Sequence, residues 1–405
     1  RPSNPFADIG FADYVRDIVA LVLLIATFSM PWDATETAAD KLHVVLATLL
    51  AMAALTLPYL KRGHVLPART QNADLRIARG LAVVPYLVVV AVTVILDIAS
   101  EGSNAGGVGV GVAFGLAGVL LAAQSRDCEL DDGPVQAQVW RLITVALGVL
   151  VAALTVVRLV FVLSDVGADP EWTAVAAAVL EPLIFLAVLA VPVIGLLRRD
   201  AVSRVLTVGL GAVALVLAFW RLSEASELPE VLSMRTDGPG ELFWLAVAAA
   251  VVAAGMSTAL HPVPASQLWL GSAAGALGLA ALVTGLAAVF WVLVIVSVDE
   301  GRGTTITLLV LTLLAFVAAL VGRNSLRAGP AQGRVVALAV AGLLVVLGII
   351  QLAVEAAGPL GRSTTGALAV TTLFVVAALV VLALTVPRSV REELGTLPLG
   401  GRQRS

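Results

Sequence analysis

The chain has 405 residues, of which 60% are hydrophobic and 13% are charged, and its formal net charge at pH 7 is −3. Soluble globular proteins are about 45–50% apolar and about 25% charged, so this composition excludes a secreted enzyme and a disordered scaffold. A chain without a basic excess is also unsuited to binding nucleic acid. We therefore expect a protein whose solvent is the lipid bilayer.

Polar residues, prolines and glycines divide the chain into twelve apolar runs, and we interpret each run as a membrane-spanning helix, which needs about 20 apolar residues. In chain order the expected spans are 14–30, 42–60, 81–99, 107–123, 142–163, 173–197, 203–220, 242–260, 268–298, 304–322, 335–354 and 364–386. The alternation of polar and apolar residues that marks a membrane β-barrel is absent from the sequence. The predicted fold class is therefore all-α, a polytopic transmembrane helical bundle of about 12 spans.

The charges predict how the bundle is oriented in the membrane. Most of the 25 Lys and Arg residues fall in alternate connections between the expected spans, and the carboxylates gather in the other connections. Because cytoplasmic loops are enriched in Lys and Arg, we expect both termini to be cytoplasmic in a multi-pass protein of the plasma membrane. The expected segments are a cytoplasmic linker (1–13), a transmembrane domain (14–386) and a cytoplasmic tail (387–405).

The odd-numbered spans are evenly spaced, which suggests six repeated helical hairpins. The clearest similarity joins the stretch from Arg141 to Arg158 with the stretch from Arg204 to Arg221, and Gln351 and Asp97 stand at the corresponding position of weaker copies. The alternative interpretation is a common bias without duplication, in which each span that runs outward begins with an inner arginine and ends with a snorkelling polar group.

Charged residues within membrane spans are costly, so each is a candidate functional residue. The sharpest pair is Arg158, on the fifth span, and Glu181, on the sixth, because helical rise places both at a similar depth below the outer boundary. Pro182 is expected to kink the sixth span beside Glu181. The pair has two interpretations, a substrate or proton site and a structural ion pair that locks the two spans together.

Further polar residues fall in the outer half of the spans, and the inner half is expected to be more uniformly apolar. The full set of candidates for a substrate or ion-pair site is Arg158, Glu181, Asp97, Arg221, Gln351 and Glu355. Polar residues gathered on one side of a bilayer predict a partly hydrated crevice that is open to the outside.

Glycines recur in the fourth expected span. Gly107, Gly111 and Gly115 are four residues apart, the spacing at which small residues allow helices to approach closely. A nucleotide-binding loop is the weaker interpretation, because no strand precedes these glycines. We expect them to be helix-packing positions.

The flanks of the first span carry a recognisable series of residues. The series reads Asn4-Pro5-Phe6-Ala7-Asp8-Ile9, then Asp13-Tyr14-Val15-Arg16-Asp17, then Pro31-Trp32-Asp33. It resembles the first span of uncharacterised multi-pass membrane proteins from high-GC actinobacteria. The resemblance implies a cell-envelope context and no known chemistry, so no functional residue is carried over from it.

The leading functional hypothesis is a transporter-like or flippase-like protein that handles an amphipathic or lipid-like substrate through an outward-facing crevice. The alternatives are a non-catalytic membrane scaffold or accessory subunit, and an envelope glycosyl- or acyltransferase that would use Asp33 or Glu36. The 5% aromatic content makes the enzyme the weaker interpretation. The sequence indicates no cofactor or metal, since Cys128 is the single cysteine. The expected partners are membrane lipids and either a second copy or a membrane partner protein.

Overall fold

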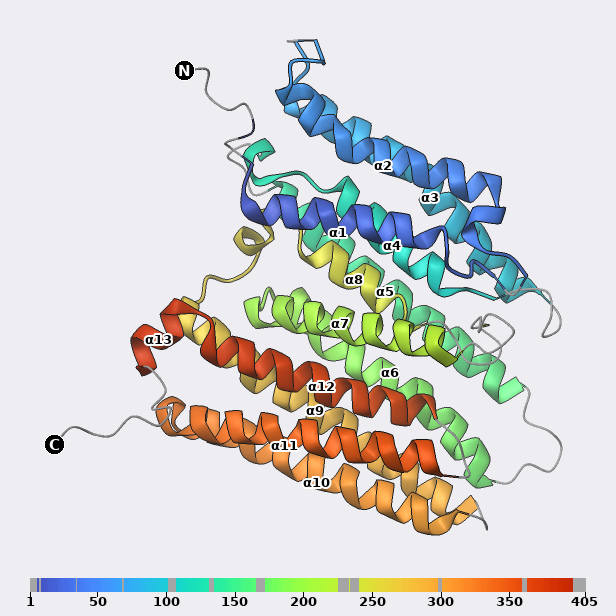
Figure 1. Cartoon of the computed structure of the whole chain (residues 1–405), viewed down its shortest axis with the longest axis vertical. Coiled ribbons are helices and arrows are strands. Elements are labelled where there is room, and N and C mark those ends of the chain that lie inside the picture. Colours follow the sequence, from blue (N-terminus) through green and yellow to red (C-terminus); the bar gives the residue numbers. More distant parts are fainter. Residues whose placement is uncertain are drawn as a thin grey trace. The chain divides into compact units, whose positions relative to one another are not determined.

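The computed structural model describes residues 6, 9–33, 35–67, 69–100, 107–130, 135–164, 172–224, 233, 240–297, 301–358 and 363–395. Helices dominate these residues (Figure 1). The α-helices are α1 (Phe11–Thr27), α2 (Leu42–Arg62), α3 (Asn72–Ala99), α4 (Val110–Ala123), α5 (Val135–Ser164), α6 (Trp172–Leu197), α7 (Ala201–Glu224), α8 (Trp244–Val251), α9 (Ala265–Ser297), α10 (Arg302–Ala328), α11 (Pro330–Ala357), α12 (Thr364–Thr385) and α13 (Arg388–Leu394). Three short 3-10 helices cover Ala38–Asp40, Asp127–Glu129 and Met256–Ala259.

Among the described residues, nine helices are long and apolar enough to cross a membrane, namely α2, α3, α5, α6, α7, α9, α10, α11 and α12. Helices α1, α4 and α8 have only 17, 14 and 8 residues. A 14-residue helix spans about 21 Å at a rise of about 1.5 Å per residue, which is less than the hydrocarbon thickness of about 30 Å. The all-α, multi-pass architecture is thus confirmed, whereas the twelve spans and the repeated hairpins stay predictions.

The chain divides into two compact units. The first unit comprises Arg1–Ala168, Phe185–Asp200 and Leu210–His261. The second comprises Asp169–Ile184, Ala201–Gly209 and Pro262–Ser405. Helices α6 and α7 therefore contribute residues to both units.

The two short helices α4 and α8 form the centre of the first unit. Helix α4 contacts α1, α2, α3 and α8, and α8 also contacts α5. Every residue of α4 except the last is buried. A helix that is hydrophobic on all sides is expected to be buried on all sides, so the uniformly apolar sequences of α4 and α8 explain their central place.

The structure differs from the expected eighth span, 242–260, which the sequence predicted to be continuous. Helix α8 ends at Val251, and Gly255 adopts a left-handed conformation with φ of 72° before the 3-10 turn Met256–Ala259. Glycine is the residue that adopts positive φ without a steric penalty. The apolar run therefore contains a helix and a turn.

Helices α9, α10, α11 and α12 form a bundle in the second unit, in which each helix contacts two of the others (Figure 1). A single residue, Gly329, connects α10 to α11, and Pro330 occupies the first turn of α11, where a proline is well tolerated. The buried core consists of Ala, Leu and Val side chains, such as Ala280, Ala319 and Leu344. Short connections and small core residues allow antiparallel helices to pack closely.

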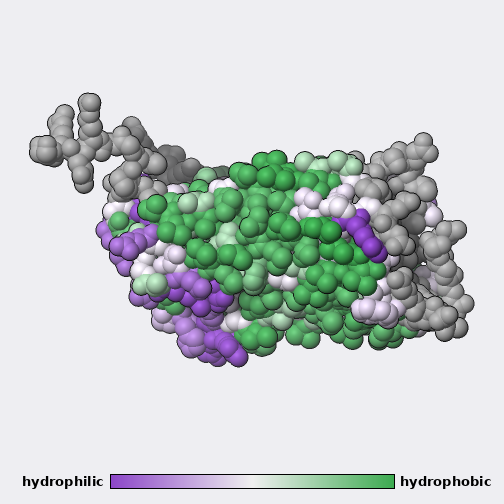
Figure 2. Space-filling model, turned by 90° about the horizontal axis from the view of Figure 1, so that it is seen from below, coloured by the Kyte–Doolittle hydropathy of each residue, from purple (hydrophilic) through white to green (hydrophobic). Residues whose placement is uncertain are grey.

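The outward faces of the long helices are strongly apolar. Large exposed side chains include Leu81 and Ile95 on α3, and Leu314 and Val317 on α10. Hydrophobic side chains also make up most of the coloured surface in Figure 2. Soluble monomers rarely expose apolar patches of this extent, so this surface indicates contact with lipid.

Candidate functional site

Six charged side chains form a buried ionic cluster in the first unit. The cluster comprises Asp13, Arg16 and Asp17 of α1, Arg79 of α3, and Arg126 and Glu129 of the segment that follows α4. None of the six is more than 8% exposed. Three carboxylates face three guanidinium groups, so the cluster is formally neutral.

Arg126 connects the segment after α4 to α1. Its Nη2 and Nε atoms donate hydrogen bonds of 2.6 and 3.1 Å to the carboxylate oxygens of Asp17. The Tyr59 hydroxyl, from α2, donates a 2.6 Å bond to the same carboxylate. At the edge of the cluster, Arg16 pairs with Asp13 at 2.6 Å. Bidentate pairing between guanidinium and carboxylate is strong and geometrically specific.

The cluster also caps the short helices. Arg79 and Arg126 donate hydrogen bonds of 2.6 and 3.0 Å to the carbonyl oxygen of Gln124, the residue that caps the C-terminus of α4. Arg79 also pairs with Glu129, and the Gln124 amide donates a 2.6 Å bond to the carbonyl of Ala249 on α8. Cations at a helix C-terminus satisfy its free carbonyls and its dipole. The arrangement thus stabilises a helix that stops within the protein.

The ionic cluster was not predicted from the sequence. The distribution of Lys and Arg between the expected spans predicts sidedness only, whereas the Arg79 and Arg126 side chains are fully buried. The positive-inside rule concerns only where Lys and Arg occur and says nothing about their burial. The available signal was the presence of Asp13 and Asp17 at the beginning of the first span, on the same expected side as these arginines.

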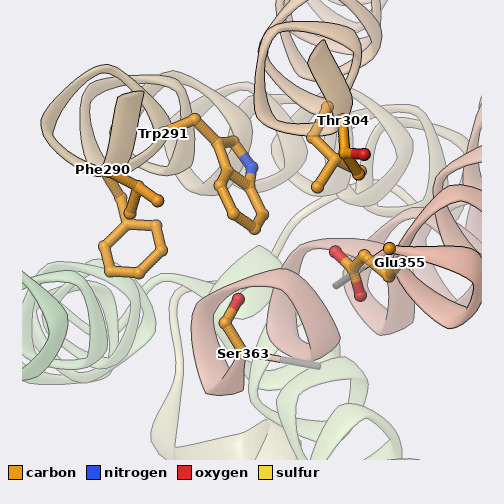
Figure 3. Close-up of a pocket in the computed structure, with 8 residues that line it drawn as sticks. Phe290, Trp291, Thr304, Glu355 and Ser363 are labelled. Carbon is orange, nitrogen blue, oxygen red and sulfur yellow. The ribbon is translucent and has the colours of Figure 1, made fainter. Parts of the chain in front are cut away.

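A cavity of about 210 Å³ lies in the second unit, where α9 and α11 end and α10 and α12 begin (Figure 3). We call it the bundle-end cavity. Its lining residues are Phe290, Trp291, Val294, Thr304, Leu308, Glu355, Gly358 and Ser363. Trp291, Leu308 and Glu355 are buried, whereas the remaining lining residues are partly exposed. The cavity therefore has a buried floor and an accessible rim.

Glu355 is 2% exposed and points into the cavity from α11. It lies against the first turn of α12, because a Cβ placed on Gly366 would overlap its Oε1 atom. In that turn the Ser363 hydroxyl accepts a 3.0 Å hydrogen bond from the Gly366 amide. The N-terminus of a helix carries a partial positive charge, so the Glu355 carboxyl group lies at the positive end of the α12 dipole.

Trp291 provides the second polar group of the cavity floor. Its side chain is 3% exposed, and its indole N–H has no hydrogen-bond partner among the described residues. Figure 3 shows the ring extending toward the space between Thr304, Glu355 and Ser363. Because buried indole N–H groups usually find an acceptor, this donor is suited to a ligand that carries an acceptor atom.

Gln351 lies one helical turn before Glu355, on the same face of α11. Its Nε2 atom donates a 2.6 Å hydrogen bond to the Thr312 hydroxyl of α10, and both side chains are buried. The structure thus brings two of the predicted polar residues into one bundle, Glu355 in the cavity wall and Gln351 in a contact between helices.

The other predicted polar residues do not line the bundle-end cavity. Asp97 is buried near the end of α3 and accepts a 3.0 Å hydrogen bond from the Ser233 hydroxyl. Arg158 is buried in the first unit, whereas Glu181 is partly exposed in the second, so their pairing stays a prediction. The side chain of Arg221 lies outside the described residues.

The glycines of the fourth expected span have different roles. Gly107 precedes α4 and adopts a φ of 118°, so it does not belong to a helical packing frame, contrary to our prediction. Gly111 and Gly115 lie in α4. A Cβ on Gly111 would lie 2.9 Å from the carbonyl oxygen of Pro31, and a Cβ on Gly115 would overlap the Tyr86 hydroxyl. Only a glycine fits these approaches without rearrangement.

The acidic residues considered for a transferase are held in a local loop. Lys41 pairs with Asp33 at 2.7 Å and with Glu36 at 2.8 Å. Partial burial favours a higher pKa for Asp33, but hydrogen bonds from Lys41 and Thr35 outweigh it and lower the pKa. No group of three or more His, Cys, Asp or Glu side chains in the described part of the chain is arranged to hold a metal ion.

Comparison with known proteins identifies a family without assigning a chemistry. A family model described as a domain of unknown function (DUF7937) matches residues 13–393. Neither the curated proteins nor the solved structures contain a match to the chain. Any assignment of function therefore depends on the geometry of the described residues.

Proposed function

The chain belongs to the DUF7937 family, and we propose that it is a transporter-like or flippase-like protein of the plasma membrane that moves an amphipathic or lipid-like molecule. The observation that carries the proposal is Glu355, a buried carboxylate in the wall of the bundle-end cavity. Ionisable groups within membrane helices are costly and usually mark a substrate or ion path.

The size of the cavity supports an amphipathic substrate. Pockets that enclose drug-sized ligands measure about 300–1,000 Å³, whereas the bundle-end cavity measures about 210 Å³. A polar headgroup fits this volume and a complete lipid does not. In the proposed mechanism the headgroup enters past the partly exposed rim, and the acyl chains stay in the surrounding lipid.

The distribution of charges supports an opening toward the outside. Arg323 and Arg327 lie near the end of α10 and Arg334 lies near the start of α11, and the cavity is at the opposite end of both helices. If the arginine-rich end is cytoplasmic, the cavity faces the outside. The proposed crevice is therefore at Glu355, whereas the sequence analysis expected it near Arg158 and Glu181.

The test is lipid movement in proteoliposomes that contain the full chain. Phospholipids labelled on an acyl chain with a nitrobenzoxadiazole fluorophore are incorporated, and dithionite added outside measures the labelled fraction that reaches the outer leaflet. We expect the wild type to raise this fraction above that of protein-free vesicles and Glu355→Gln to abolish the increase. The matched control is Glu392→Gln, which changes an exposed carboxylate of α13. Equal activity of wild type and Glu355→Gln would refute the proposal.

The scaffold alternative also has an observation in its favour. The ionic cluster is formally neutral, and each of its members has a partner among the other members or the neighbouring backbone. Such a cluster fixes the arrangement of helices without requiring a substrate. A scaffold should copurify from native membranes with a stoichiometric partner protein, and proteoliposomes of the chain alone should then move no lipid.

A further inference from the structure

We infer that the bundle-end cavity binds an ester carbonyl of a membrane lipid through two hydrogen-bond donors of its wall. The inference deepens the proposed function and rests on it for the class of molecule that is moved. The two donors are the Trp291 indole N–H and the Ser363 hydroxyl. Glu355 also lines the cavity, but it has an interaction partner within the chain, so its carboxyl group sets no requirement on the charge of the ligand.

Trp291 determines that the ligand carries an acceptor atom. Its side chain is 3% exposed, and its indole N–H has no hydrogen-bond partner among the described residues. An indole nitrogen only donates hydrogen bonds, and leaving a buried donor unsatisfied costs free energy. A ligand oxygen in the cavity would therefore gain a hydrogen bond that this part of the chain does not satisfy.

Ser363 provides the second donor. Its oxygen accepts a 3.0 Å hydrogen bond from the Gly366 amide, and a hydroxyl group also carries one proton that it can donate. Figure 3 shows this hydroxyl on the side of the residue that faces Trp291. A carbonyl oxygen has two lone pairs, so one carbonyl can accept from both Trp291 and Ser363.

The remaining lining favours an acceptor without charge. Phe290, Val294 and Leu308 are apolar, and the described residues of the lining include no Lys or Arg. Phosphate and carboxylate groups are usually bound by such cations, whereas an ester carbonyl is an uncharged acceptor joined to apolar chains. In a glycerolipid the ester carbonyls adjoin the headgroup, which the proposed function places in the same cavity.

The depth of the cavity also agrees with an ester group. Helices α9, α10 and α11 have 33, 27 and 28 residues, which gives lengths of about 50, 40 and 42 Å. The hydrocarbon layer is about 30 Å thick, so the ends of these helices extend into the interfacial region. Trp291 lies six residues before the end of α9, a distance of about 9 Å. Lipid ester groups occupy the same boundary, between the headgroups and the acyl chains.

The test compares two lipids that differ only in their carbonyl groups. The full chain is purified in detergent and offered equimolar dioleoyl phosphatidylcholine and its dioleyl diether analogue, in which a methylene group replaces each ester carbonyl. Native mass spectrometry counts the bound lipids. We expect about fivefold more adducts with the diester, which corresponds to about 1 kcal/mol, the typical net value of one hydrogen bond. Equal adducts, or a preference for the diether, would overturn the inference.

A matched pair of variants tests the role of Trp291. Trp291→Phe keeps an aromatic ring in the cavity floor and removes the N–H donor, so it should abolish the preference for the diester at an unchanged melting temperature. Trp269→Phe makes the same change near the start of α9, outside the cavity lining, and should retain the preference. A preference that survives in folded Trp291→Phe would overturn the inference.

A second pair keeps the test valid if Trp291→Phe does not fold. Ser363→Ala removes the hydroxyl and should reduce the preference for the diester. Ser363→Thr retains a hydroxyl, which also caps a helix, and should restore the preference. If both variants prefer the diester as strongly as the wild type does, the inference fails.

The lipid-movement assay separates this inference from the proposed function. Preferential binding of the diester without movement of lipid would refute transport and leave the ester site standing. Movement of lipid by a chain that binds diester and diether equally would overturn the ester site and leave transport standing.

Discussion

Arg126 donates two hydrogen bonds, of 2.6 and 3.1 Å, to the carboxylate of Asp17, which lies 109 residues earlier in the sequence. Both side chains are buried, and the Tyr59 hydroxyl shares the same carboxylate. The pair ties α1 to the segment that follows α4. The ion pair therefore stabilises the region of the first unit in which the short helices α4 and α8 end within the protein.

Asp17→Asn should destabilise the protein strongly. Removing one partner of a buried ion pair leaves an uncompensated charge and costs about 3–5 kcal/mol. The melting temperature in detergent micelles measures the loss. Arg126→Lys should also lower it, because lysine cannot form the bidentate pair. The double variant Asp17→Asn with Arg126→Gln should lose less stability than the sum of the losses of the single variants Asp17→Asn and Arg126→Gln, and additive losses would show that the pair is not coupled.

Gly115→Ala should destabilise the contact between α4 and its neighbours. The added methyl group would overlap the Tyr86 hydroxyl, and overpacking of a core costs about 1–3 kcal/mol. The matched control is Gly342→Ala in α11, where a Cβ would meet nothing within 4 Å. Because alanine is favoured over glycine by about 1 kcal/mol in a helix, the control should melt at the same temperature or higher. Equal melting of the two variants would contradict the packing role.

Hydropathy predicts which segments form apolar helices, but it does not predict the residues at which these helices end. All twelve predicted runs contain helix, because hydrophobicity determines which segments leave water. The break after Val251 depends on the backbone at Gly255, and hydropathy does not report a backbone conformation. For the same reason Gly107 was placed in a helix that begins only at Val110.

Some residues of the candidate site could be predicted from the local sequence. Glu355 and Gln351 stood out as polar residues in an apolar span, and the structure puts Glu355 in a cavity wall. The contribution of Trp291 was not predicted, because it depends on how α9 packs against α10 and α11. The burial of Arg79 and Arg126 was missed because their partners lie 50 and 109 residues away, a distance over which sequence alone reveals no pairing.

The loop between α1 and α2 should lose order in acid. The pKa of Asp33 lies below its ordinary 3.8, since the hydrogen bonds from Lys41 and Thr35 outweigh the effect of burial. A depressed pKa contributes stability that is present above the ordinary value and is lost as the pH falls through the folded value. Deuterium exchange of residues 31–41, divided by the intrinsic rate at each pH, should therefore show protection at pH 6 that falls below pH 3.8. Lys41→Met should shift this loss to higher pH, and an unshifted profile would exclude Lys41 as the cause.

Cys128 offers a native probe of sidedness. It is the single cysteine, and it is partly buried in the segment after α4. Burial raises its pKa above the ordinary 9.0, so labelling by a maleimide should be slow at pH 7 and faster at pH 9, where more thiolate is present. In intact cells a membrane-permeant maleimide should label it and an impermeant one should not. Labelling by the impermeant reagent would reverse the proposed orientation.

The most direct measurement is an electron cryo-microscopy map of the wild-type chain in nanodiscs that contain membrane phospholipids. The account predicts non-protein density in the bundle-end cavity, in contact with Glu355 and Trp291, and the loss of this density in Glu355→Gln. A cavity filled by the chain's own side chains, or density that is unchanged in the variant, would contradict the account.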